Sequence, residues 1–173
     1  MEIKRSRSDF RALSRVVKQV SLENLYLMKC SAARTPDAAS LEKVFLRLDF
    51  SSELFSADER NNKFAARSYM KVEGLPDEDD DNAVVTIEAE YIVNYKIVKN
   101  KGVIDRSDIE KFCSMNAIYN AWPFFRELIL NMTSRMDLPP FTLPLLKIRP
   151  KAKSKKQDGR QSKKNTGSKD PHR

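Results

Sequence analysis

The sequence contains few of the residues on which common active sites depend. Its only histidine, His172, is the second-last of 173 residues, so residues 1–148 offer no imidazole for acid–base catalysis or zinc binding. Of the four glycines, only Gly74 and Gly102 precede residue 149, which excludes a Walker loop and a dinucleotide-binding fingerprint. We therefore expect no cofactor-binding and no metal-binding residues.

Cysteine and long apolar runs are also scarce. Cys30 and Cys113 lie far apart without the spacing of metal ligands, and each is expected to be a free, small, buried hydrophobic residue. No run approaches the roughly 18 apolar residues of a membrane span, and no apolar signal segment opens the chain. The sequence predicts a protein of the reducing cytoplasm, with no membrane insertion.

Positive charge is confined to the C-terminal end. Lys and Arg outnumber Asp and Glu by 32 to 24, but ten of these basic residues and two of the acidic ones lie in residues 149–173. Residues 1–148 therefore carry no net charge. The segment 149–173 has no aromatic residue and one aliphatic residue, Ala152, so it is predicted to be a disordered Lys-rich tail. Three roles are open for it: a solubilising tail, a sequence-blind contact with nucleic acid or the ribosome, and a contact with acidic partners.

Alternation of apolar and polar residues predicts four β-strands before residue 99. Residues 1–15 have no sustained period and are predicted to be a flexible arm or a short helix. The strands are expected at residues 16–30, with a bulge between Leu22 and Leu25, and at residues 44–50, 62–72 and 83–98.

The segments between these strands are polar. Residues 51–62 are expected to cross between sheet elements or to form a helical turn, and the acidic run 77–82 a solvated turn. A calcium loop is disfavoured there, because an EF-hand needs alternating ligands and a central glycine. Connections this short cannot hold crossover helices, which predicts an antiparallel meander.

The period changes to that of a helix after Gly102. Ser107 and Glu110 have the spacing of a capping box, predicting a helix over residues 108–119, and a second helix is expected from Pro123 to Met136. Residues 141–146 are predicted to be extended but outside the sheet, because Pro144 cannot donate to a central strand. The fold class is therefore α+β, a four-stranded antiparallel sheet packed by two C-terminal helices.

A catalytic site is not expected. Glu88 and Glu90 share one face of the last strand and could act as an acid–base pair, but charged residues on a solvated sheet face are far more common. Ser107 is accounted for by its predicted cap and Cys113 by burial, so neither is needed as a nucleophile. The chain is predicted not to be an enzyme.

Apolar residues are in surplus near the end of the neutral region. Two helices offer one inward face, and the adjacent Phe124 and Phe125 point about 100° apart, so part of this apolar surface should stay exposed. An exposed apolar groove is typical of a site for an extended or partly unfolded chain, or of a subunit interface.

Three motifs in this region resemble the C-terminal signature of the SecB chaperone family. They are Asn-Ala-Trp-Pro-Phe-Phe-Arg-Glu at 120–127, Met-Thr-Ser-Arg at 132–135 and Leu-Pro-Pro-Phe-Thr-Leu-Pro-Leu at 138–145. The resemblance extends over residues 16–148, which would form the SecB-like domain. It implies a dimer of dimers that holds unfolded or nascent polypeptide clients, without ATP, in apolar grooves where sheet, helices and connecting loop meet. The predicted client-binding residues are Leu46, Leu48, Trp122, Phe124, Phe125, Leu128, Phe141, Leu143 and Leu145.

Two departures from the family pattern argue against coupling to the translocation motor SecA. Asn24 and Met28 occupy first-strand positions that are acidic in export chaperones of the family, although Glu88 is retained. The Lys-rich tail replaces the family's C-terminal amphipathic helix. The resemblance leaves two chaperone roles open: protein export, or a dedicated role such as guarding the antitoxin of a toxin–antitoxin module. The alternative function is nonspecific nucleic-acid or ribosome binding through residues 149–173.

Overall fold

The computed structural model describes residues 2–5, 13–40, 43–98 and 104–150. The predicted tail beyond residue 150, and residues 6–12 of the predicted arm, lie outside the described residues. Among the described helices, none is long and apolar enough to cross a membrane.

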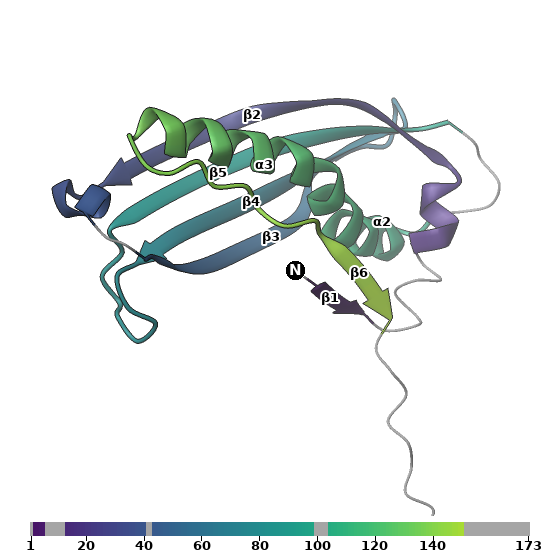
Figure 1. Ribbon diagram of the computed structural model, residues 1–173. Coiled ribbons are helices and arrows are strands. Elements are labelled where there is room, and N and C mark those ends of the chain that lie inside the picture. The colour runs from purple at the N-terminus through teal and green to yellow at the C-terminus, as the bar shows by residue number, and fades with distance from the viewer. Residues whose placement is uncertain (1, 6–12, 41–42, 99–103, 151–173) are drawn as a thin grey trace, which may run out of the picture.

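A four-stranded antiparallel sheet forms one layer of the molecule (Figure 1). Its strands are β2 (Val20–Arg34), β3 (Phe45–Asp58), β4 (Lys63–Leu75) and β5 (Val85–Ile97). Their spatial order is β2-β5-β4-β3, so the sheet is not a simple meander as predicted. Short turns join β3, β4 and β5, whereas the connection after β2, which contains the 3-10 helix η1 (Pro36–Ser40), crosses to the opposite edge. This is the strand order of a Greek key.

The strand boundaries differ from the sequence-based prediction at several places, and β2 continues to Arg34 although the strand was expected to end at residue 30. Residues 13–17 form a short helix that buries Val16, so β2 begins at Val20 rather than at residue 16. The expected bulge is confirmed, as a register shift between Leu22 and Asn24. β3 continues to Asp58, where a crossing segment was expected, because its polar residues pair along β4; the hydroxyls of Ser52 and Ser68 are 3.0 Å apart.

One continuous helical stretch replaces the two separate helices predicted. It consists of α2 (Arg106–Phe112), the π-helix η2 (Cys113–Ala117) and α3 (Ile118–Arg135). Asp105 is the N-cap of α2 and Ser107 lies inside the helix, so the capping box is wrong. Pro123 lies within α3 and not at its start, because a buried stripe runs through it. That stripe is Ile118, Ala121, Trp122, Phe125 and Ile129.

The helices cover one face of the sheet and enclose an aromatic core. The rings of Phe64 and Tyr95 stack at 5.1 Å between centroids, and Phe112 meets Tyr95 edge-on at 5.0 Å. Asn120 donates a hydrogen bond from Nδ2 to the Tyr95 hydroxyl at 2.9 Å, which satisfies a polar group that burial would otherwise penalise. Cys113 is fully buried beside this core, as expected, whereas Cys30 on the edge strand is half-buried; both thiols are free.

A second, smaller sheet joins the two ends of the described chain. β1 (Glu2–Arg5) pairs in parallel with β6 (Lys147–Pro150) and lies apart from the main sheet (Figure 1). The predicted arm therefore includes a strand, and β6 extends across the predicted boundary between residues 148 and 149. No local pattern indicates a pairing of four residues between segments this far apart.

Candidate functional site

An extended segment lies against α3 on the helical side of the sheet. We call residues 139–146 the strap. Three hydrogen bonds tie it to α3: the indole nitrogen Nε1 of Trp122 donates to the carbonyl oxygen of Pro144 at 2.9 Å, Arg126 Nε donates to the carbonyl oxygen of Leu143 at 2.7 Å, and the Phe141 amide donates to Thr133 Oγ1 at 3.3 Å. The side chains of Leu143 and Leu146 are buried. The predicted extended conformation outside the sheet is confirmed.

The turn between α3 and the strap has a defined geometry. Asp137 adopts a left-handed conformation with φ of 56°, and the Leu138 amide donates to the carbonyl oxygen of Thr133 at 3.0 Å. This is the Schellman arrangement, which satisfies the last helical carbonyls. Pro139 and Pro140 follow at once and prevent the helix from continuing. The strap therefore starts at a fixed point and in a fixed direction.

A mostly apolar cavity of about 250 Å³ lies between the strap, the end of α3 and the sheet. Gly74 forms part of its floor, where a Cβ atom would come within 2.8 Å of Val44 Cγ1. The cavity is smaller than the roughly 300–1,000 Å³ usual for sites that hold drug-sized ligands, so it suits an amino-acid side chain better than a cofactor. Its lining includes Val44, Leu46, Ile87, Ile129, Leu138 and Phe141.

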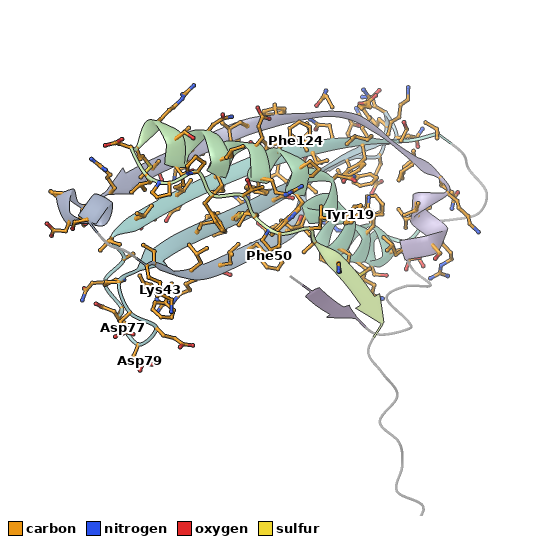
Figure 2. The ribbon with its side chains drawn as sticks, viewed as in Figure 1. Lys43, Phe50, Asp77, Asp79, Tyr119 and Phe124 are labelled. Atoms are coloured by element: carbon orange, nitrogen blue, oxygen red, sulfur yellow. The ribbon has the colours of Figure 1, made fainter. Side chains whose placement is uncertain are left out.

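Three apolar side chains of β3 lie at or beside the cavity. Leu46, Leu48 and Phe50 alternate on the face of β3 that looks toward the helices. Leu46 is 44% exposed, whereas Leu48 and Phe50 are half-buried; the Phe50 ring meets the Trp122 ring edge-on at 5.9 Å. Figure 2 shows Phe50 below the strap, on the side away from Phe124. We call this surface, made by the cavity, Leu48, Phe50 and the strap, the β3 groove.

Only part of the predicted client-binding set lies on an accessible surface. Leu46 and Phe141 line the cavity, Leu48 lies beside it, and Leu145 of the strap is 63% exposed. Leu128 is half-buried, and Phe124 is 43% exposed but lies elsewhere on α3.

Three predicted binding residues are core residues instead. Trp122, Phe125 and Leu143 are at most 3% exposed, so they cannot contact a client unless the fold opens. Trp122 and Phe125 lie on the side of α3 that faces the sheet and belong to its buried stripe. The side chain of Leu143 packs from the strap into the core. Ile129 and Leu138 line the cavity but were not among the predicted binding residues, although Ile129 lies one helical turn after Phe125 and Leu138 directly precedes the two prolines.

A second apolar surface lies on the other side of α3, toward β2. Leu22, Leu27, Tyr119 and Phe124 are each between 43% and 51% exposed. Leu22 and Leu27 pair with Tyr95 and Tyr91 of β5, which places them on the helical face of the sheet. Figure 2 shows Tyr119 and Phe124 along α3, and the Tyr91 hydroxyl donates to the Phe124 carbonyl at 3.5 Å. We call these four residues the β2 surface.

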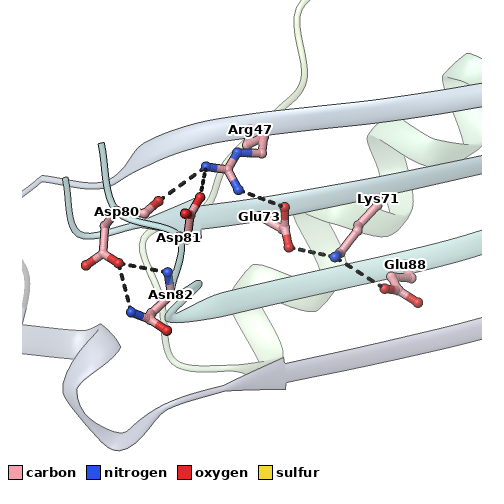
Figure 3. A network of polar contacts seen from close by, with 7 residues as sticks. All are labelled: Arg47, Lys71, Glu73, Asp80, Asp81, Asn82 and Glu88. Carbon is pink, nitrogen blue, oxygen red and sulfur yellow. Dashed lines mark hydrogen bonds and ion pairs between the residues drawn. The ribbon is translucent and has the colours of Figure 1, made fainter. Parts of the chain in front are cut away.

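The outer face of the sheet carries an ion-pair network that includes one of the candidate carboxylates. Lys71 Nζ lies 2.6 Å from a Glu73 oxygen and 3.9 Å from Glu88, and Arg47 contacts Glu73 and Asp81 at 3.8 and 3.3 Å (Figure 3). Hydrogen bonding to Glu73 raises the pKa of Lys71. Partly exposed pairs of this kind stabilise a fold by at most about 1 kcal/mol each. Among the described residues, no group of acidic, His or Cys side chains could hold a metal ion.

A wider cavity of about 530 Å³ opens at the opposite end of the sheet, under the start of α2. Its floor is apolar, from Leu54, Phe64, Ile97 and Ile109, and its rim carries charges of both signs, including Asp58, Glu59, Lys63 and Arg106.

Comparisons with known proteins point to one fold. No family model and no curated protein matches the sequence. Among solved structures, the chain is similar to a SecB-like chaperone of Mycobacterium tuberculosis, solved in complex with a ChAD peptide from the HigA1 antitoxin. The TM-score is 0.68 at 18% identity, over 80% of this chain and 99% of that chain, and the protein therefore has a SecB-like fold. A protein of unknown function from Streptococcus agalactiae is more distant, with a TM-score of 0.42 at 14% identity over 73% of this chain and 98% of that chain.

Proposed function

We propose that this protein is an ATP-independent chaperone of the cytoplasm that holds non-native polypeptides in the β3 groove. The observation that carries the proposal is the open apolar cavity, framed by a strap that hydrogen bonds hold in place. A groove that keeps its shape while empty suits an extended chain with apolar side chains. The SecB-like fold and the peptide held by the mycobacterial neighbour support the same function. The proposal includes no catalytic step.

The energetics favour weak binding at each groove. Burying a client side chain the size of Leu or Phe contributes about 1.5–3 kcal/mol, whereas ordering the client backbone costs about 1–2 kcal/mol per residue. A single cavity of about 250 Å³ accepts one or two such side chains. Retention of a long client then requires several grooves on one particle. The combined affinity of linked grooves can exceed that of a single groove by about 10²-fold or more.

We infer that a homo-oligomer, as in the family's dimer of dimers, supplies these grooves. β2 is an edge strand of 15 residues whose outer hydrogen-bonding groups are unpaired within the described chain. Exposed edges of this length are normally covered. The β2 surface beside it is apolar, and Tyr26 and Met28 on β2 are also about half exposed. A second copy meeting this edge would cover both features.

We favour a dedicated client over general export. Asn24, at a position that is acidic in export chaperones, accepts a hydrogen bond from Asn94 Nδ2 at 2.7 Å, so this part of the outer face is neutral. A neutral surface offers little to a partner that recognises carboxylates, which argues against SecA. An antitoxin is one such dedicated client, in line with the peptide bound by the mycobacterial neighbour.

The test is suppression of aggregation by matched variants. Leu46→Ser changes a cavity residue that is 44% exposed, and Leu130→Ser changes a helical leucine that is 37% exposed and does not line the cavity. We expect the wild-type chain and Leu130→Ser to keep a denatured test protein soluble, and Leu46→Ser to lose most of this activity. Equal activity of both variants would place the client elsewhere, and no activity of the wild-type chain would reject the chaperone function. Mass in solution, measured in parallel, tests the oligomer.

A further inference from the structure

The position of β6 is fixed by the strap that precedes it. It follows the strap directly, and Leu146, the last strap residue, is only 7% exposed. The strap is itself tied to α3 by hydrogen bonds from Trp122 and Arg126. Because these contacts lie outside the small sheet, β6 keeps its place whether or not another strand pairs with it.

β1 is attached much less firmly. It pairs with β6 from Glu2↔Lys147 to Arg5↔Pro150, and within the described chain the two strands pack mainly against each other. Parallel pairing is slightly weaker per residue than antiparallel pairing, and an isolated two-stranded sheet is marginally stable at best. In this pair, β6 is thus the anchored strand and β1 the replaceable one.

The strap leads from the β3 groove to β6. Phe141 lines the cavity near its start, and Leu145 near its end is 63% exposed, two residues before β6 begins. Figure 1 shows β6 continuing from the strap past the start of α3, with β1 beside it. An extended chain that follows the strap out of the groove would next meet the edge of β6 that β1 now occupies.

We propose that β6 is a strand-addition site, at which a stretch of client main chain replaces β1. This inference rests on the proposed chaperone function and adds a second contact to the groove. Main-chain hydrogen bonds give affinity with little dependence on side-chain sequence, which suits a non-native client. β1 acts as an internal competitor, because client affinity at β6 is reduced by the fraction of molecules in which β1 is bound.

A covalent lock tests the exchange. Ile3 and Ile148 are register partners, and the spacing of neighbouring strands, about 4.8 Å, falls within the Cα range of a disulfide. Ile3→Cys and Ile148→Cys are introduced into the full chain together with Cys30→Ser. The client probe is reduced, carboxymethylated α-lactalbumin, which stays unfolded. Oxidation should weaken probe binding about fivefold or more and reduction should restore it, while Cys30→Ser alone should respond to neither.

Hydrogen exchange and a deletion variant provide two further tests of the replacement of β1 by the client. With the probe bound to the wild-type chain, the amides of β1 should exchange faster while those of β6 stay protected. Deleting residues 2–5 should raise probe affinity about twofold to fivefold, because the competitor is gone.

The outcomes separate this inference from the function on which it rests. A wild-type chain that binds no probe rejects the chaperone function. A chain that binds the probe equally well when locked and unlocked keeps that function but overturns the exchange. Failure of the disulfide to form in the folded chain overturns the pairing itself, as would unchanged exchange of β1 in the presence of bound probe.

Discussion

Trp122 and Pro144 are joined by a hydrogen bond of 2.9 Å, from the indole nitrogen of α3 to a carbonyl oxygen of the strap. The bond links the core to the wall of the β3 groove, because the Trp122 ring is buried while the strap borders the cavity. The shape of the proposed binding site therefore depends on a residue that no client can touch.

Trp122→Phe should loosen the strap without emptying the core. The phenyl ring keeps much of the apolar contact, but the Pro144 carbonyl loses its donor, which should cost about 1–3 kcal/mol of unfolding free energy. Urea denaturation gives this value, and hydrogen exchange of the leucine amides in the strap should increase. If exchange there matches that of the wild-type chain, the bond does not hold the strap.

Phe125→Ala should destabilise the whole fold. Phe125 was predicted from the sequence to bind clients, but it is 1% exposed and meets Tyr91 edge-on at 4.9 Å. Removing a buried phenyl ring costs about 3–5 kcal/mol. Circular dichroism during urea unfolding measures the loss, with Phe124→Ala, at 43% exposure, as the control. Similar midpoints for the two variants would contradict the assigned core.

Gly74→Ala should destabilise the chain, although alanine usually improves a strand. The added Cβ would lie 2.8 Å from Val44 Cγ1 and 3.3 Å from Val85 Cβ, so the cavity floor must shift. Overpacking of this kind costs about 1–3 kcal/mol. The double variant Gly74→Ala with Val44→Ala removes the obstructing methyl group and should recover part of the loss, as a double-mutant cycle would measure.

Alkaline pH should weaken the fold through Cys113. Burial raises the pKa of this thiol to about 12, from an ordinary value of about 9. Above pH 9 the unfolded thiol ionises while the folded one stays neutral, so unfolding releases a proton and stability falls as the pH rises toward 12. Urea midpoints between pH 8 and pH 11 should fall less steeply for Cys113→Ala than for the wild-type chain. If the urea midpoints of the two proteins fall equally steeply with pH, the pKa of Cys113 is the same in the folded and unfolded states.

Thiol labelling should distinguish the two cysteines. Cys30 is half-buried on the edge strand, whereas Cys113 is fully buried at the start of the π-helix η2. In the native protein at pH 8, a maleimide should modify Cys30 much faster than Cys113, and both should react in urea. Fast native labelling of Cys113 would mean that the helical layer opens easily. Assembly through the β2 edge would slow labelling of Cys30 as protein concentration rises.

Local pattern was sufficient for the central strands and insufficient at the edges. In β4, the alternation from Phe64 to Val72 coincides with burial, because both neighbouring strands and the helices enforce it. The second half of β3 was missed, since its inward Ser52 meets another serine and its outward residues face solvent. Pro123 indicated a helix start, but the burial of Trp122 and Phe125 on either side of it outweighed the lost hydrogen bond.

The candidate site was predictable only in part for a similar reason. The sequence showed that apolar residues are in surplus before and around Phe141. It did not show whether Phe124 or Phe125 turns toward the core. That choice depends on the helix phase, which the π-helix over residues 113–117 shifts. Leu46 and Phe141 were found because strand alternation and the prolines fix their direction, whereas Leu143 was misjudged because an extended segment has two faces.

The strand order also determines when the sheet can be completed during synthesis. Among the described strands, β2 pairs with β5 alone, from Val20↔Ile97 to Arg34↔Val85, so its partner lies more than 50 residues downstream. Contacts this distant in sequence slow folding, and an unpaired strand is prone to aggregation while it waits. Until Ile97 has left the ribosome, β2 presents Leu22, Tyr26 and Leu27 as an exposed apolar strand. During that interval the nascent protein has the features of the chains that it is proposed to hold.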